Sequence, residues 1–105
     1  MKKIADIIAH DFWEYHSVNG RKRISEIVIG RPRRDVKDRH GDWYCPIVIT
    51  GFLSKVTNIF GVGPVDALLN AMKLVQAFQD KVGSVSPRAR PNKPLHRIGN
   101  KSGSR

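Results

Sequence analysis

The sequence predicts an α+β domain: an antiparallel β-meander of about four strands with one C-terminal helix packed on one face, then a disordered basic tail. Three observations support this prediction. Residues 43–50 alternate in polarity, Asn19-Gly20 is a strong hairpin signal, and residues 64–82 carry an apolar stripe at helical spacing. Because a sheet and a helix each bury one apolar face, two packed layers are the simplest arrangement.

The first two strands form the predicted hairpin. We expect residues 4–10 to form a short helical or irregular start and a strand to follow over residues 11–18. Asn19-Gly20 suits a tight turn that needs positive φ angles, and it leads into a second strand over residues 23–30. Arg31-Pro32 ends that strand, because proline lacks the donor that a ladder needs.

A charged, mobile loop is expected over residues 33–42, before two further strands. In the third strand, over residues 43–50, one face carries Trp43, Cys45, Ile47 and Ile49. Pro46 indicates that this strand lies at an edge of the sheet or contains a bulge. A fourth strand is expected over residues 55–60.

The helix has the clearest boundaries. Gly63-Pro64 begins it, since a proline in the first turn needs no amide partner, and Gly83 ends it. Asp66 falls in the first turn, where a negative charge suits the helix dipole. The stripe predicted to face the sheet consists of Val65, Leu68, Leu69, Met72, Val75 and Val82, widened by Ala71 and Phe78.

The 105 residues divide by composition into a single domain over residues 1–85 and a flexible tail over residues 86–105. The tail has too few apolar residues to offset the entropy of ordering it, and it holds six basic residues and no acidic one. It supplies more than half of the net charge of +10. A basic arm of this kind attracts polyanions, although a purely solubilising tail has the same composition.

Membrane and secreted classes do not fit this composition. No run of about 18 apolar residues is present, and Asp6 interrupts the short apolar stretch at the N-terminus. Cys45 is the only cysteine, so the chain has no internal disulfide of the kind that small secreted domains usually need. We therefore expect a cytoplasmic protein.

No set of residues predicts catalysis, a metal or a cofactor. Cys45 shares the apolar face of its strand, which favours a core residue over a nucleophile. His40 with Asp42 is the other candidate for enzyme chemistry, but the four histidines lack zinc-ligand spacing. Gly61-Val62-Gly63 precedes a helix without the lysine and hydroxyl residue of a phosphate-binding loop, so it favours a simple turn.

Basic residues gather in two clusters at opposite ends of the second strand, roughly 25–30 Å apart by strand rise. The first consists of Arg21, Lys22 and Arg23, and the second of Arg31, Arg33 and Arg34, with Lys37 and Arg39 beyond. Nearby aromatic residues can stack on bases while cations hold phosphates. For Trp13 and Trp43 we favour the alternative, a place in the core. Arg88 and Arg90 of the tail complete the candidate polyanion contacts.

The chain resembles a family of small bacterial domains of unknown function. The resemblance rests on Ile29-Gly30-Arg31-Pro32, on Gly41-Asp42-Trp43-Tyr44-Cys45-Pro46, on Phe60-Gly61-Val62 and on Asp66-Ala67 with the helix that follows. It covers residues 24–82 and implies a compact sheet with one C-terminal helix. The insertion of Gly63-Pro64 separates Val62 from Asp66, where the family runs directly on. The resemblance implies no activity, ligand or catalytic residue.

These observations predict a non-enzymatic binding module. Its basic loops and tail contact a polyanion, most plausibly nucleic acid. The alternative is a protein-interaction protein, of an accessory or immunity type, that docks on an acidic protein partner. An exposed face with Tyr44 and Val48 would then form the docking surface. A basic surface serves both hypotheses, so the sequence leaves the choice between them open.

Overall fold

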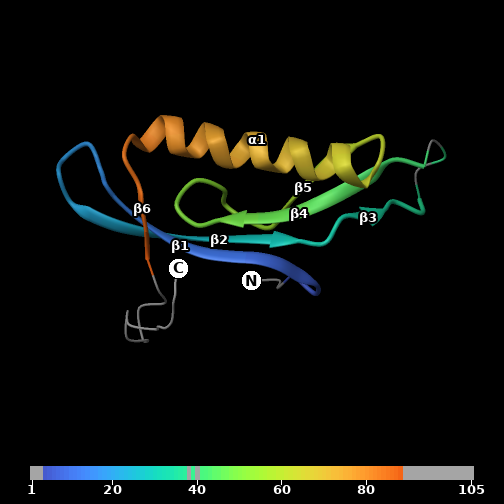
Figure 1. The fold of residues 1–105 in the computed structure, drawn as a ribbon, viewed down its shortest axis with the longest axis horizontal. Helices are drawn as coiled ribbons and strands as arrows, with labels where there is room; N and C mark the ends of the chain where they lie inside the picture. The colour runs from blue at the N-terminus through green and yellow to red at the C-terminus, as the bar shows by residue number, and fades with distance from the viewer. Residues whose placement is uncertain (1–3, 38, 40, 89–105) are drawn as a thin grey trace, which may run out of the picture.

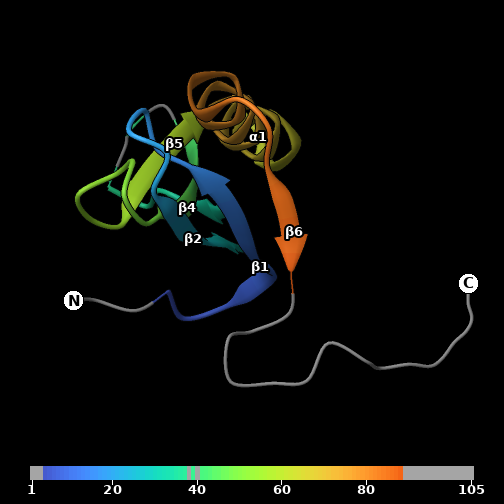
Figure 2. The ribbon, with the colours of Figure 1, turned by 90° about the vertical axis from the view of Figure 1, so that its left-hand side faces the viewer.

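The computed structural model of the chain describes residues 4–37, 39 and 41–88. Within them, one antiparallel sheet is covered on one face by a single helix, which confirms the predicted α+β fold (Figure 1). The elements, in chain order, are β1 (Ile7–His16), β2 (Lys22–Gly30), β3 (Arg33–Arg34), β4 (Trp43–Ile49), β5 (Thr57–Gly61), α1 (Pro64–Val82) and β6 (Ser86–Arg88). Figure 2 shows the two layers from one end, with β6 at the side of the sheet.

The sheet is the predicted meander with an added edge strand. β1 pairs with β2, β2 with β4, and β4 with β5, each pair antiparallel. After α1 crosses the sheet, β6 returns to pair with β1, with Arg88 opposite Phe12. Residues 86–88 therefore belong to the sheet and not to a flexible tail. The rest of the predicted tail, residues 89–105, lies outside the described residues.

β3 continues the line of β2 along β4, where the sequence predicted only a loop. Ile29 lies opposite Ile47 and Arg33 opposite Tyr44, so the register shifts by one residue between the two pairs. Such a shift is a β-bulge. Pro46 lies in β4 at this interruption, as the bulge interpretation predicts. The edge-strand interpretation is wrong, because β4 also pairs with β5 on its other side.

The N-terminal residues depart from the predicted helical or irregular start. β1 begins at Ile7 and pairs along its length with β2, so sheet pairing overrides the partial helical pattern. The hairpin loop spans residues 17–21. Gly20 has a φ angle of 81° and donates its N–H to the Ser17 carbonyl at 2.8 Å. The Asn19-Gly20 signal thus marks the turn correctly.

α1 has the predicted boundaries, Pro64 and Val82, and its inner face was predicted in part: Ala71, Val75 and Phe78 are buried, and Leu68 and Val82 pack against the core. Its buried residues are Ala67, Ala71, Val75 and Phe78, whereas Val65, Leu69 and Met72 are exposed by 69%, 55% and 44%. A Cβ atom on Gly61 would lie 2.4 Å from the Ala67 backbone nitrogen. This close approach of helix and strand requires small residues at the contact, and it turns the larger aliphatic side chains outward.

The core lies between α1 and the sheet. The predicted apolar face of β4 is confirmed, since Cys45, Ile47 and Ile49 are fully buried beside Ile27 and Ile29 of β2. The Phe78 ring of α1 meets the rings of Trp13, Tyr15 and Phe52, with centroids 5.4–6.3 Å apart. Contacts between aromatic rings at such separations add to the free energy of area burial.

Two hydrogen bonds attach the helix start to β5. The Asp66 carboxylate accepts the Val62 N–H at 3.0 Å, and the Asn70 side chain donates to the Phe60 carbonyl at 2.9 Å. Asp66 thereby satisfies an amide just before the first turn, in addition to facing the positive end of the helix dipole. These contacts fix the end of β5 that carries Phe60.

Candidate polyanion-binding surface

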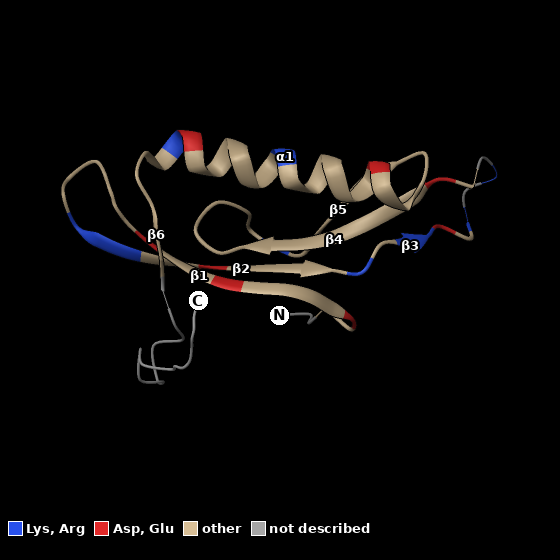
Figure 3. Ribbon diagram, in the orientation of Figure 1, with Lys and Arg blue, Asp and Glu red and all other residues tan. Residues whose placement is uncertain are grey.

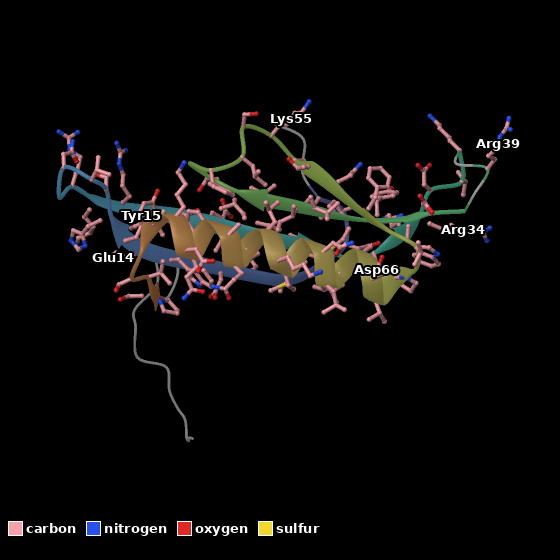
Figure 4. The ribbon with its side chains drawn as sticks, turned by 90° about the horizontal axis from the view of Figure 1, so that it is seen from above. Glu14, Tyr15, Arg34, Arg39, Lys55 and Asp66 are labelled. Carbon is pink, nitrogen blue, oxygen red and sulfur yellow. The ribbon has the colours of Figure 1, made fainter. Side chains whose placement is uncertain are left out.

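The two basic clusters lie at opposite ends of the sheet, as predicted (Figure 3). We call Arg21, Lys22 and Arg23 the hairpin cluster, and Arg31, Arg33, Arg34, Lys37 and Arg39 the basic rim. Figure 4 shows Arg34 and Arg39 of the rim at the end of the molecule opposite Glu14 and Tyr15. The clusters are far enough apart to be judged as separate candidate sites.

Most cations of the basic rim have no acidic partner among the described residues. Arg33 pairs with Asp6, with Nη2 and Oδ2 2.5 Å apart. The Asp35 carboxylate accepts the Lys37 backbone N–H at 3.1 Å and so closes a turn. Within residues 4–37, 39 and 41–88, no ion pair forms to Arg31, Arg34, Lys37 or Arg39.

The N-terminal segment and the bulge hold the basic rim in place. The Arg31 N–H donates to the Asp6 carbonyl at 2.7 Å, beside the pairing of Arg33 with the same residue. A Cβ atom on Gly30 would lie within 2.6 Å of the side chains of Pro46 and Ile4, so the segment packs directly on the bulge. The arginines are thus attached to the sheet by backbone contacts.

Gly41 gives the Arg34 guanidinium room. Its φ angle is 71°, and a Cβ atom there would lie 3.0 Å from Arg34 Nη2. The Asp35 N–H donates to the Asp42 carbonyl at 2.8 Å, which joins the two sides of the loop next to this contact. Gly41 therefore combines a left-handed backbone with the space that the cation occupies.

Two hollows adjoin the basic rim on the sheet face opposite α1. One has a volume of about 330 Å³ and is lined by Ile4, Ala5, Arg33, Tyr44, Pro46, Val56 and Asn58. The other, of about 270 Å³, is lined by Arg34, Asp35, Val36, Lys37, Tyr44, Asn58 and Phe60. Tyr44 and Asn58 border both, so the hollows are neighbours on one surface that combines cations with aromatic rings.

The hairpin cluster is less suited to an extended anion. Lys22 Nζ lies 3.8 Å from Glu14 Oε2, a distance at which the pair partly neutralises the lysine. Arg23 lines a hollow of about 470 Å³ with Tyr15, Ser17, Ile24, Thr50 and Gly51. This hollow is larger than those at the rim, but it holds a single cation. Charge density therefore favours the basic rim despite the smaller volumes there.

The other predicted contact residues differ in how far the structure agrees with their predicted roles. Val48 is only 8% exposed, so the predicted docking face of Tyr44 with Val48 is wrong for Val48. Arg88 belongs to β6, and Arg90 lies outside the described residues. Trp13 and Trp43 pack against the core, the alternative that the sequence analysis favoured for them.

Phe60 and Asn58 were not among the predicted contact residues. Phe60 was expected only as the end of the fourth strand, yet it is 51% exposed beside Tyr44. The signal was present in the alternation of β5, because Ile59 packs against the core and its two neighbours must face the other way.

Cys45 has the environment of a core residue. It is fully buried, and its Sγ donates to the Gly30 carbonyl at 3.3 Å. Burial raises the pKa of the thiol above its ordinary value of 9.0, which disfavours the thiolate that a nucleophile requires.

We expect Cys45 to resist a thiol reagent in the native protein and to react in denaturant, as absorbance of the released reagent anion would show. The unfolded thiol loses its proton near pH 9.0 while the buried thiol keeps its own. The stability that the protonated thiol contributes is therefore present below pH 9.0 and is lost as the pH rises through the folded-state pKa. Rapid labelling of the native protein at neutral pH would contradict this assignment.

The histidine candidates for enzyme chemistry are described only in part. His10 Nε2 lies 2.6 Å from Glu26 Oε2, while His40 is outside the described residues. Among the described residues, no three His, Cys, Asp or Glu side chains form a group that could hold a metal ion. The helix start after Gly61 provides few backbone donors for a phosphate. The Val62 N–H already donates to the Asp66 carboxylate, and Pro64 has no backbone N–H.

Comparison of the chain with protein families, curated proteins and solved structures found no match. The resemblance to a bacterial domain family therefore stays a prediction. No helix in the described part of the chain is long and apolar enough to cross a membrane.

Proposed function

We propose that the protein is a non-enzymatic module that binds nucleic acid through the basic rim. The observation that carries this proposal is a group of four cations within nine consecutive residues, Arg31, Arg34, Lys37 and Arg39, that form no ion pair in the described part of the chain. Phosphates that meet such cations release their condensed counterions, which drives association. Arginine also binds a phosphate through two parallel hydrogen bonds.

The net charge of +10 supports the same assignment, because it raises the rate at which the protein meets any polyanion. Net charge alone does not indicate where on the protein a polyanion binds. The basic rim is the candidate location, because its cations lie on a turn that is closed by hydrogen bonds and attached to the sheet through β3.

The test is fluorescence-anisotropy binding of labelled oligonucleotides to the full chain across a salt series. The double variant Arg31→Gln/Arg34→Gln is compared with Lys73→Gln/Lys81→Gln, which removes the same charge from exposed positions of α1. We expect the rim variant to bind more weakly and to lower the slope of log affinity against log salt by roughly 1.4–1.8, the value for two lost phosphate contacts. Equal losses in the two variants would contradict a localised site.

A chain truncated after Arg88 separates the contribution of residues 89–105 from that of the rim while it keeps β6. The rim assignment predicts that this chain still binds and still responds to Arg31→Gln/Arg34→Gln. Loss of all binding on truncation would instead assign the affinity to the five basic residues of residues 89–105 and would contradict the rim assignment.

A second candidate function, docking on a protein, is favoured by the outer face of α1. Val65, Leu69 and Met72 of α1 are exposed, and Val62, two residues before the helix begins, is exposed by 82%. Exposed apolar side chains that adjoin one another are typical of protein-interaction surfaces. This candidate predicts that the protein forms a one-to-one complex with a protein partner, and that the complex survives nuclease treatment. The substitution Leu69→Lys should abolish this complex, whereas Arg31→Gln/Arg34→Gln should not. Recovery of nucleic acid alone would count against it.

A further inference from the structure

We propose that Phe60 and Tyr44 form a stacking platform for unpaired bases, so that the ligand of the basic rim is single-stranded nucleic acid. This inference rests on the proposed function and names its ligand class. It is carried by an aromatic pair beside the cations, the exposed Phe60 and the half-buried Tyr44, a feature that binding to phosphates alone does not require.

Phe60 exposes apolar surface to water, which costs free energy. Its side chain lies at the end of β5, on the sheet face opposite α1, and its ring centroid is 6.1 Å from that of Tyr44 at an interplanar angle of 52°. Phe60 is 51% exposed and lies outside the core cluster, so about half of its surface is available to a ligand. Aromatic rings in this situation are the usual contacts of flat nucleobases.

Cations line the same hollow as the two rings. Arg34 and Lys37 border the hollow that contains Phe60, and Arg33 borders the neighbouring one with Tyr44. A strand that places its phosphates on the basic rim therefore brings its bases over the rings. In a duplex the base faces are stacked on one another, so only an unpaired strand can use both features.

Asn58 adds a group that can contact a base edge. It borders both hollows, and its side-chain amide takes part in no hydrogen bond among the described residues. An amide carries both donors and an acceptor, as the edges of nucleobases do. Phosphate binding would leave the acceptor unused.

The experiment measures binding of the full chain to three labelled dodecamers by fluorescence anisotropy at one salt concentration. The probes are a single strand of mixed sequence, the same strand in a duplex, and an abasic sugar–phosphate backbone. Phe60→Ala is compared with Leu69→Ala, which removes an apolar side chain of similar exposure from α1. Phe60→Tyr serves as the conservative variant, and circular dichroism checks that each variant is folded.

We expect Phe60→Ala to weaken binding of the single strand by about 5-fold or more, the effect of one lost base stack, and to leave the abasic backbone unaffected. Phe60→Tyr and Leu69→Ala should bind the single strand as the parent chain does. If the abasic backbone binds as tightly as the single strand, or the duplex binds more tightly, the stacking platform is wrong while the proposed function stands. If none of the probes binds, both proposals fail.

Discussion

Replacing Phe78 with alanine should lower the free energy of unfolding by about 3–5 kcal/mol, the usual cost of deleting a buried phenylalanine. Its side chain is 1% exposed and meets three other aromatic rings across the interface of helix and sheet. For a domain of this size the loss lowers the thermal midpoint by more than about 12 °C. Urea denaturation followed by tryptophan fluorescence measures it, since Trp13 packs on the same ring.

Leu69→Ala is the matched control on the outer face of α1. The side chain is 55% exposed, so we expect a loss below about 1 kcal/mol. If Phe78→Ala is unfolded in buffer, Phe78→Leu keeps most of the apolar volume and gives a measurable intermediate value. Similar losses at positions 69 and 78 would contradict a packing of α1 that buries Phe78 and leaves Leu69 exposed.

Gly61→Ser should be the second severe substitution, with an expected loss of about 1–3 kcal/mol or more. A Cβ atom at residue 61 would lie within 2.7 Å of backbone atoms of Asp66 and Ala67, which cannot move aside as a flexible side chain can. The helix start must therefore shift away from β5. The free energy of unfolding from urea titration measures the effect.

Gly63→Ser supplies the control for this prediction two residues away. A Cβ atom there meets nothing within 4 Å, the backbone is extended with φ of −154°, and serine is a preferred residue at a helix N-cap. We expect a neutral or slightly stabilising effect. A loss at residue 63 as large as at residue 61 would contradict the close packing of α1 on β5.

Local signals in the sequence predicted the parts of the fold that local chemistry determines. Gly20 marks the hairpin turn, Pro64 and Gly83 bound the helix, and the alternation of β4 identifies its buried face. Each depends on backbone conformation or polarity within a few residues, which a single sequence displays directly.

Elements that depend on distant partners were missed or wrongly oriented. β3 and β6 are short and polar or proline-containing, so only their pairing with β4 and β1 makes them strands. The inner face of α1 follows from the contact of Ala67 with Gly61, and alanines contribute little to an apolar periodicity.

The candidate site was half predicted. Charge is visible in the sequence, so Arg31, Arg33 and Arg34 can be identified as candidate contacts from the sequence alone. The sequence could not show that Asp35 closes a turn or that Asp6 forms an ion pair with Arg33, because both interactions depend on the folded loop. Phe60 and Tyr44 also meet only across the pairing of β5 with β4.

The most direct test of the central claim is a titration of the full chain with a single-stranded oligonucleotide, followed through backbone amide NMR shifts. Binding at the basic rim predicts shifts concentrated at Arg31, Arg34, Lys37, Tyr44 and Phe60, with the outer face of α1 unchanged. Shifts confined to α1 around Leu69 and Met72, or to the hairpin cluster, would contradict the assignment of nucleic-acid binding to the rim.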